Sequence, residues 1–207
     1  MKPTSASLHN SPVFSRRLQG RHISRAFLIV LGLLLLSVLV LACSSSSSRS
    51  LASVDDVKIT AYQGQDVLGG KEVNLSKLLA NGKPVVLNLW AGQCPPCRAE
   101  MPDFQQVSDA YKGQIVLVGL DVGPFVGLGT RDDAKQLLQD LKITYPVGTT
   151  FDSKIIENYQ IVAMPTTFFL KPNGEVYRKW TGYMSRDRIE EMVKGLLEAS
   201  KSSQQGL

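Results

Sequence analysis

The sequence predicts an α/β fold in which helices pack on a central mixed β-sheet. Two continuous apolar runs rich in β-branched residues, 84–90 (PVVLNLW) and 114–121 (QIVLVGLD), suit strands that are buried on both faces. A helical pattern follows each run, and a strand–turn–strand pattern with a final amphipathic segment ends the chain. This order of elements is typical of helices layered on one sheet.

The first 42 residues differ in charge from everything that follows. Residues 1–25 form a basic region, and residues 26–42 form an uncharged apolar segment. Such a pair is typical of a secretory signal or a membrane anchor, with the basic end in the cytoplasm. We therefore expect the rest of the chain on the extracytoplasmic (periplasmic or outer) face of the cell membrane. The basic residues before position 43 account for the whole formal net charge of +5: Lys2, Arg16, Arg17, Arg21 and Arg25.

Cys43 ends a tetrapeptide, VLAC at 40–43, that resembles a bacterial lipobox. The resemblance implies that Cys43 becomes lipidated. An uncleaved transmembrane anchor is the alternative, and either would tether the chain to the membrane. Residues 43–52 have the composition of a flexible serine-rich linker. From Cys43 onward basic and acidic residues are equal in number, 18 each, so we expect no nucleic-acid partner.

Residues 53–200 form the predicted globular domain, and residues 201–207 form a short tail. Thr130, followed by acidic residues, is a clear helix start. The last helix has apolar residues at helical spacing along one face. In order, we expect a strand at 56–62, a helical turn at 74–83, the strand at 84–90, a helix at 95–112, the strand at 114–121, a glycine-rich loop at 123–129, a helix at 130–142, a helical turn at 153–161, a strand at 166–171, a turn at 172–174, a strand at 175–182 and a helix at 185–201.

Cys94 and Cys97 enclose Pro95 and Pro96 in a C-x-x-C motif, which could bind a metal, staple a loop or exchange electrons. Zinc needs four ligands, and the chain after residue 43 has no histidine and no second cysteine pair. A permanent disulfide stabilises mainly by closing a long loop, and this loop is very short. We therefore expect a redox-active disulfide and neither a metal nor another cofactor.

The expected position of Cys94 supports the redox interpretation. Proline is favoured at the first helical position, so Pro95 places Cys94 at a helix N-terminus, where free N–H groups favour a thiolate. Cys97, one turn later, can resolve a mixed disulfide. Because Pro95 and Pro96 lack N–H groups, we expect weaker stabilisation of the Cys94 thiolate than in a pair that includes a histidine.

Two segments, WAGQCPPCRAEMP (90–102) and AMPTTFFLKPNGEV (163–176), resemble the thioredoxin-like superfamily, and most closely its TlpA/ResA-type membrane-anchored thiol-disulfide oxidoreductases. The resemblance covers residues 53–200 and implies a thioredoxin fold with an inserted helix. It implies that Cys94 is the attacking thiolate and Cys97 the resolving one. It also implies that Pro165 is a cis-proline facing the disulfide, and that the Met164 backbone pairs with an extended substrate peptide.

Three other residues near the motif have more than one interpretation. Trp90 matches the family tryptophan, and it either shapes the substrate-binding surface beside the disulfide or packs in the core. Asn88 occupies the place of the buried acid of thioredoxin, and an amide cannot exchange that proton. Glu100 lies three residues after Cys97, on the same helix face. The resemblance implies that it assists proton transfer to the thiols, and a surface glutamate is the alternative.

These features favour an extracytoplasmic, membrane-tethered protein-disulfide oxidoreductase. Family analogy favours a reductant that takes electrons from an integral-membrane donor and passes them to client proteins, for example in cytochrome c maturation. A disulfide-forming oxidant would use the same residues. A peroxiredoxin-like peroxidase needs proline and threonine or serine where this chain has Leu87 and Ala91. A non-catalytic docking module is the remaining alternative, and the presence of both cysteines argues against it.

Overall fold

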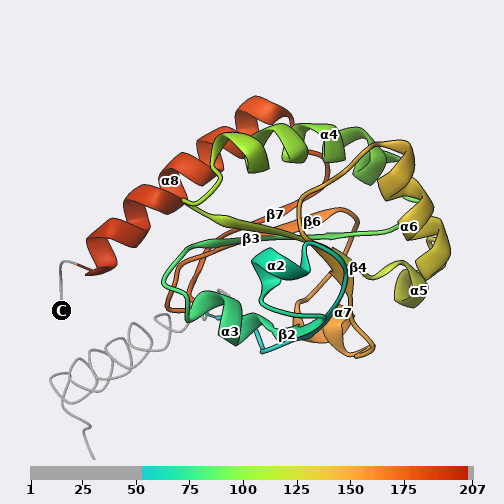
Figure 1. Cartoon of the computed structure of the whole chain (residues 1–207), viewed down its shortest axis with the longest axis horizontal. Coiled ribbons are helices and arrows are strands. Elements are labelled where there is room, and N and C mark those ends of the chain that lie inside the picture. Colours follow the sequence, from blue (N-terminus) through green and yellow to red (C-terminus); the bar gives the residue numbers. More distant parts are fainter. Residues whose placement is uncertain (1–52, 205–207) are drawn as a thin grey trace, which may run out of the picture. The chain divides into compact units, whose positions relative to one another are not determined.

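The computed structural model describes residues 53–204 (Figure 1). The predictions for the basic region 1–25, the apolar segment 26–42, Cys43 and the linker to residue 52 lie outside the described residues. Within residues 53–204, no helix is both long enough and apolar enough to cross a membrane.

A seven-stranded mixed sheet forms the centre of the domain, in the order β2-β1-β5-β4-β3-β6-β7. The two central strands, β3 and β4, are parallel and buried along their whole length, as their apolar sequences predict. Strand β6 pairs antiparallel with the other side of β3. The strands are β1 (Lys58–Gln63), β2 (Glu72–Asn74), β3 (Val85–Trp90), β4 (Val116–Asp121), β5 (Val147–Thr149), β6 (Thr166–Leu170) and β7 (Val176–Thr181).

Helices cover both faces of the sheet, with α4, α6 and α8 on one face and α2, α3 and α7 on the other (Figure 1). The helices are α2 (Gln65–Leu68), α3 (Leu75–Leu79), α4 (Pro95–Ala110), α5 (Gly123–Val126), α6 (Arg131–Asp140), α7 (Ile155–Asn158) and α8 (Arg186–Gln204). The active-site core lies beneath α4, α6 and α8 and includes Trp90, Cys97, Met101, Phe104, Leu137, Tyr145, Phe169 and Ile189. The opposite core includes Ile59, Leu75, Leu87, Leu89, Val118, Ile155, Tyr159 and Phe168.

The predicted helices and central strands are confirmed, with small changes at their ends. Helix α4 ends at Ala110, and α6 begins after Thr130 with a capping box to Asp133, because each residue's side chain bonds the other's backbone N–H. One prediction is wrong: the glycine-rich segment 123–129 is not all loop, since Gly123–Val126 form α5 with a proline in its first turn. Helix α2 and strands β2 and β5 were not expected.

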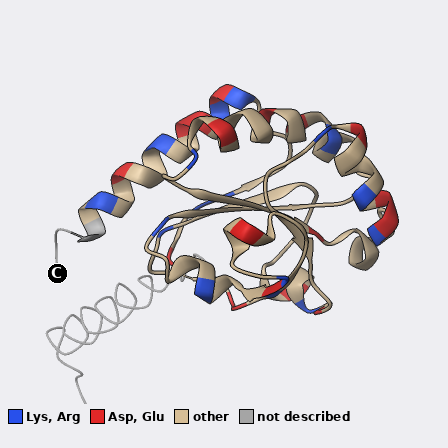
Figure 2. Ribbon diagram, viewed as in Figure 1, with Lys and Arg blue, Asp and Glu red and all other residues tan. Residues whose placement is uncertain are grey.

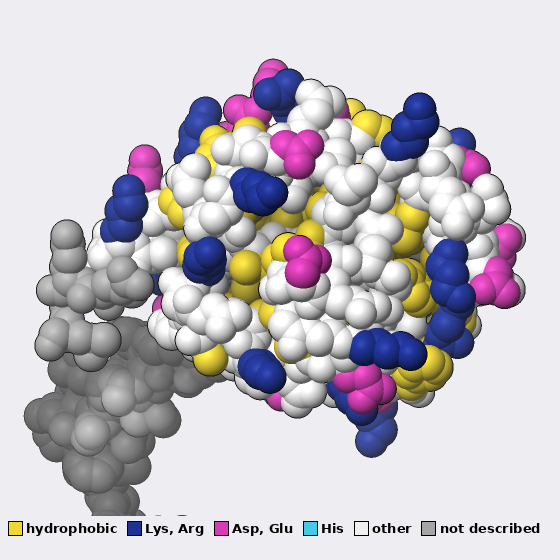
Figure 3. Space-filling model, in the orientation of Figure 1, with side chains coloured by type: hydrophobic (Ala, Val, Ile, Leu, Met, Phe, Trp, Pro, Cys, Tyr) yellow, Lys and Arg dark blue, Asp and Glu magenta, His cyan; other side chains and the backbone are white. Residues whose placement is uncertain are grey.

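Residues of both charge signs are spread along α4, α6 and α8 (Figure 2). On the face shown in Figure 3, basic and acidic side chains are intermixed and no single-sign area dominates. This distribution agrees with the near-neutral composition of the chain after residue 43.

Candidate active site

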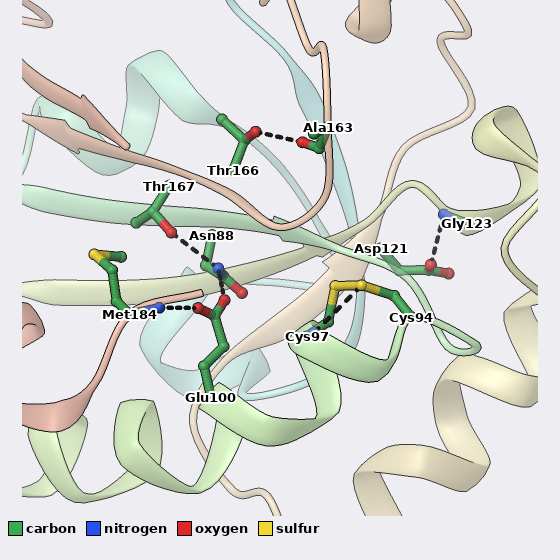
Figure 4. The surroundings of a disulfide bond; sticks show 10 residues. All are labelled: Asn88, Cys94, Cys97, Glu100, Asp121, Gly123, Ala163, Thr166, Thr167 and Met184. Carbon is green, nitrogen blue, oxygen red and sulfur yellow. Dashed lines mark hydrogen bonds between the residues drawn. A yellow bond between two sulfur atoms is a disulfide. The ribbon is translucent and has the colours of Figure 1, made fainter. Parts of the chain in front are cut away.

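The two cysteines lie where β3 gives way to α4, and they form a disulfide (Figure 4). Cys94 is the N-cap residue of α4, with Pro95 and Pro96 in the first two helical positions. The Cys97 backbone N–H donates to Cys94 Sγ over 3.3 Å. It is the first N–H of the helix that is available to this sulfur, because the two prolines have none.

The two sulfur-bearing residues differ in access to solvent. Cys94 is 3% exposed, whereas Cys97 has no exposed surface at all. A partner thiol or disulfide can therefore reach Cys94 first. Both sulfurs are nearly covered, and the attacking role of Cys94 and the resolving role of Cys97 stay predictions.

The loop that carries Cys94 is held by the segment between β4 and α6. The Gln93 backbone N–H donates to Leu128 O over 2.8 Å. A side chain at Gly92 would place its first carbon 2.6 Å from the backbone nitrogen of Ala134, near the start of α6. Glycine is needed at position 92 because the backbone of α6 lies directly against it. The inserted helix is therefore part of the frame around the disulfide.

The proline segment before β6 lies at the same edge of the sheet. The Met164–Pro165 peptide bond is cis, as the resemblance implies. Pro165 is followed by Thr166, which pairs with Leu89 near the end of β3, so the cis-proline segment and the disulfide loop leave neighbouring strands side by side. The Gly182 backbone N–H donates to Pro165 O over 2.8 Å, which fixes this segment to the end of β7.

Glu100 is fully buried beneath α4, so its interpretation as a surface glutamate is wrong (Figure 4). Its Oε1 accepts from Asn88 Nδ2 over 2.9 Å, and its Oε2 accepts from the Met184 backbone N–H over 3.0 Å. Burial raises the pKa of Glu100 to about 7, despite these two hydrogen bonds, which act to lower it. A carboxyl group with this pKa can both take up and release a proton near neutral pH.

Asn88 has a role that sequence reasoning missed. It cannot exchange a proton, but its side-chain nitrogen bridges Glu100 on α4 and Thr167 Oγ1 on β6, at 2.9 and 3.0 Å. It therefore holds the carboxyl group that can exchange one. The contact joins residues 12 apart in the chain, and no local pattern in the sequence indicates it. The Met184 contact is likewise invisible in the sequence.

Trp90 is a residue of the active-site core and has no exposed surface. Of its two interpretations, core packing is the one that the structure supports. The expectation that Trp90 forms substrate-binding surface beside the disulfide is corrected accordingly, because a client cannot contact a side chain that is completely covered.

Asp121, at the end of β4, is a second buried carboxyl group that was not expected. It accepts from Tyr62 Oη at Oδ2 and from the Gly123 backbone N–H at Oδ1, both over 2.9 Å. Burial raises its pKa, against the lowering effect of these bonds. Its contacts tie the end of β4 to α5 and to β1. A charged residue closing an otherwise apolar run is the only sequence signal that could have indicated it.

A surface depression of the domain lies away from the disulfide. It has a volume of about 600 Å³ and lies near the N-terminal ends of β3 and β4, whereas the cysteines follow the C-terminal end of β3. Its lining includes Lys83, Gln105, Lys112, Thr144 and Pro146 but neither cysteine. Among residues 53–204 no cluster of three histidine, cysteine or acidic side chains could hold a metal ion.

The chain is similar to proteins that are named thiol-disulfide oxidoreductases, and it spans less than two thirds of the length of the ResA relative described here. A model of the AhpC/TSA family matches residues 55–179. The thiol-disulfide oxidoreductase ResA of Oceanobacillus iheyensis is 40% identical over 121 residues, which span 57% of this chain and 58% of that protein. The sporulation thiol-disulfide oxidoreductase A of Bacillus subtilis is 28% identical over 55% of this chain and 68% of its own length.

Solved structures give the same fold. The exposed lipoprotein thioredoxin of Streptococcus pneumoniae superposes with a TM-score of 0.56 at 25% identity, covering 68% of this chain and 98% of that one. The predicted thioredoxin-like α/β arrangement of helices on a mixed sheet is thereby confirmed.

Proposed function

The chain belongs to the AhpC/TSA family. We propose that it is a thiol-disulfide oxidoreductase acting on client proteins. One observation carries the proposal: a disulfide caps α4, and only its Cys94 side reaches the surface. The ResA and sporulation oxidoreductase relatives, which bear the same activity in their names, support it.

In the reducing direction the reaction has two exchange steps. The Cys94 thiolate attacks one sulfur of a client disulfide, which breaks the client S–S bond, forms a mixed disulfide and releases one client thiolate. The Cys97 thiolate then attacks Cys94 Sγ, which releases the second client thiolate and leaves the Cys94–Cys97 disulfide. The client gains two electrons and two protons, and this chain loses both. The oxidising direction is the same sequence reversed.

Glu100 is the group that we assign to proton transfer. Cys97 is completely buried, so its proton must leave through the protein during the second step. Glu100 lies one turn further along the same helix, and its pKa of about 7 suits transfer in both directions at neutral pH.

The client is expected to bind along the cis-proline segment. Among the described residues, no hydrogen bond involves the Met164 backbone, so its N–H and C=O are available to an extended peptide. Val162, two residues before Met164, is 84% exposed. Tyr183 is 48% exposed and follows Gly182, whose backbone N–H donates to Pro165 O. An extended client segment with apolar side chains beside its cysteine fits this surface.

We further propose that the chain works as a tethered reductant on the extracytoplasmic face of the membrane. Its tether would be the apolar segment 26–42 or a lipid on Cys43, and the naming of its pneumococcal structural relative as an exposed lipoprotein supports the lipid. An integral-membrane protein would supply electrons, and apocytochrome c cysteines are a suitable client. The disulfide itself is the redox group, with no further cofactor in the proposed reaction.

The competing functions have less support in the site. Peroxidase chemistry of the peroxiredoxin type would need a proline and a threonine or serine at the positions that hold Leu87 and Ala91, and both of these residues are buried. A docking module would have no need of a sulfur pair with one accessible and one protected member.

The deciding experiment is the reduction potential of the Cys94–Cys97 pair in the full chain, measured in detergent by equilibration with dithiothreitol or glutathione. A value near that of thioredoxin, about −270 mV, supports the reductant, and a value near about −120 mV shows an oxidant. Peroxide consumption with a thiol donor, tested on the same sample, would support the peroxidase instead. A Cys97→Ser variant should trap clients as mixed disulfides.

A further inference from the structure

Three buried side-chain atoms of the active-site core lack a hydrogen-bond partner within the described part of the chain: Asn88 Oδ1, Trp90 Nε1 and Tyr145 Oη. Asn88 and Trp90 are both completely covered, and Tyr145 is 2% exposed. A buried polar atom without a partner costs about 1–3 kcal/mol, so three in one core require an explanation. The explanation depends on whether they face one point.

The amide of Asn88 is oriented by its neighbours on one side. Its nitrogen donates to Glu100 and to Thr167, and Thr167 lies on β6 directly across from Asn88. The oxygen of the same amide lies on the side of the amide away from Thr167. On β4 the residue paired with Asn88 is Gly119.

Gly119 is also where the other two side chains meet. A first side-chain carbon at Gly119 would lie 2.9 Å from Trp90 Nε1, 3.1 Å from Val147 Cγ2 and 3.3 Å from Cε2 of the Tyr145 ring. Glycine is needed here because these two rings cross the strand at this residue. The Tyr145 backbone is fixed in place: its N–H donates to Gln105 Oε1 over 3.2 Å and its C=O accepts from Gln63 Nε2 over 2.8 Å. The side chain is nearly covered, and its hydroxyl lies away from solvent.

The hydrogen-bond donors and acceptors of these groups match those of one water molecule. Trp90 Nε1 is a donor, Tyr145 Oη has its proton to donate, and Asn88 Oδ1 is an acceptor. The Glu100 carboxylate keeps further acceptor capacity beyond its two bonds. We propose that one internal water molecule lies above Gly119, accepts from Trp90 and Tyr145, and donates to Asn88 Oδ1 and the Glu100 carboxylate. Internal waters of this kind usually make about three hydrogen bonds to buried groups that would otherwise have no partner.

This arrangement makes Tyr145 and Trp90 positioning residues for Glu100. A water that donates to the carboxylate stabilises its charged form and so opposes the effect of burial. The other charged group that acts on Glu100 is Asp103 on α4, which raises its pKa. β3 and β6 present the uncharged Asn88 and Thr167, and the segment leading into α8 presents the Met184 backbone. Tyr145 interacts electrostatically with Glu100, which agrees with the proximity that the proposal requires.

The significance of this water for catalysis rests on the proposed function, because it acts through Glu100. The existence of the water does not depend on the proposed function. A bound water with no thiol–disulfide exchange by the wild-type chain would refute the proposed function and leave the hydration site standing, so the two can fail separately.

The direct test is a proton NMR measurement of water contacts in the ¹⁵N-labelled, oxidised full chain in detergent. We expect a cross-relaxation peak between the Trp90 indole N–H and a water of long residence time. Trp180 is the internal control, because its Nε1 donates to the Tyr183 carbonyl over 3.4 Å. An indole peak for Trp90 without any contact to water would overturn the proposal.

The functional test compares Tyr145→Phe with Tyr159→Phe. Both remove one hydroxyl from a tyrosine that is almost completely covered, but Tyr159 lies in the opposite core, where its Oη donates to Asp55 O. The protonation of Glu100 is followed by the infrared band of its carboxyl C=O, identified by its loss in Glu100→Gln. We expect Tyr145→Phe to raise the pKa of Glu100 by about one unit and Tyr159→Phe to leave it unchanged. An unchanged pKa in Tyr145→Phe, or an equal shift in both variants, would overturn the positioning role. The NMR test still decides if the first variant does not fold.

Discussion

The two cores on either side of the sheet are built from similar apolar side chains but treat polar groups differently. The opposite core buries Tyr159, whose hydroxyl donates to the Asp55 backbone carbonyl. Among the described residues the buried carboxyl groups are Glu100 and Asp121. The active-site core buries Glu100 and Asn88 together with two ring groups, Trp90 Nε1 and Tyr145 Oη, that have no partner within residues 53–204. Burying a carboxyl group costs free energy. The burial of Glu100 in the active-site core therefore indicates that this side of the sheet is less stable than an apolar core would be, in return for a group that can exchange protons.

The largest effect should come from the sulfur of Cys94 in the active-site core. Cys94→Ser removes the attacking thiolate, so disulfide reduction should fall to the background rate, while the unfolding free energy changes little, because the lost bridge closes a very short loop. An insulin or client-peptide reduction assay measures the first, and denaturant unfolding measures the second. Residual turnover above background would contradict the role of Cys94.

A truncation in the opposite core should do the reverse. Phe168 has no exposed surface and packs edge-on against Tyr159, with ring centroids 5.3 Å apart. Phe168→Ala should lower the unfolding free energy by about 3–5 kcal/mol and leave the exchange rate per folded molecule unchanged. Guanidinium unfolding combined with activity at low temperature checks both. A fall in activity that exceeds the loss of folded protein would show that the two cores are not separable.

The pH dependence of stability should be governed by Glu100. Its pKa is about 7 in the folded, oxidised chain against 4.5 for an unperturbed glutamate, so the folded state holds a proton between these values that the unfolded state has released. The contribution of Glu100 to the unfolding free energy should therefore be largest below about pH 4.5. It should fall by about 3 kcal/mol as the pH rises through 7. Denaturant unfolding across this pH range measures it.

Glu100→Gln provides the control for that dependence. The variant lacks the titrating group, so the difference in unfolding free energy between it and the wild type should change across the same pH window. Its rate of thiol exchange should also vary less with pH. Identical pH slopes in both proteins would assign the dependence to another group, such as Asp121.

The smallest effect concerns the helix start beneath Cys94. Pro96→Ala restores an N–H at the second helical position, from which an N-cap side chain can accept. The added donor should stabilise the Cys94 thiolate and lower the midpoint of its titration by about half a pH unit. Ultraviolet absorbance of the thiolate against pH in the reduced chain measures it. A rise or no change would mean that the helix terminus does not act on this sulfur.

Elements with a long, one-sided or wholly apolar pattern are predictable from the sequence, and short ones are not. β3 and β4 are continuous apolar runs, and Thr130 with its acidic first turn marks the start of α6 in the sequence itself. β2 and β5 are three residues long, too short for a period to appear, and exist because β1 pairs with both. α5 has the composition of a loop, because its glycine and proline outweigh one short turn of helix.

The candidate site likewise has a part that the sequence predicts and a part that only tertiary contacts determine. The positions of Cys94, Cys97 and Pro165 follow from local motifs, and the structure has a disulfide and a cis bond there. What surrounds them follows from tertiary contacts: Asn88 reaches Glu100 across a helix–sheet interface, and the burial of Trp90 depends on how the rings pack over Gly119. A sequence window around the motif contains none of this information.

The contact between Gly92 and the start of α6 has a consequence for how relatives of this chain can diverge. The insert carrying α5 and α6 abuts the loop that bears the reactive sulfur, and Leu128 holds that loop by a backbone bond. A change of length in the insert would therefore shift the sulfur relative to the client surface without altering any residue of the C-x-x-C motif. Partner choice could evolve through a segment that takes no part in the electron transfer, provided that position 92 stays glycine.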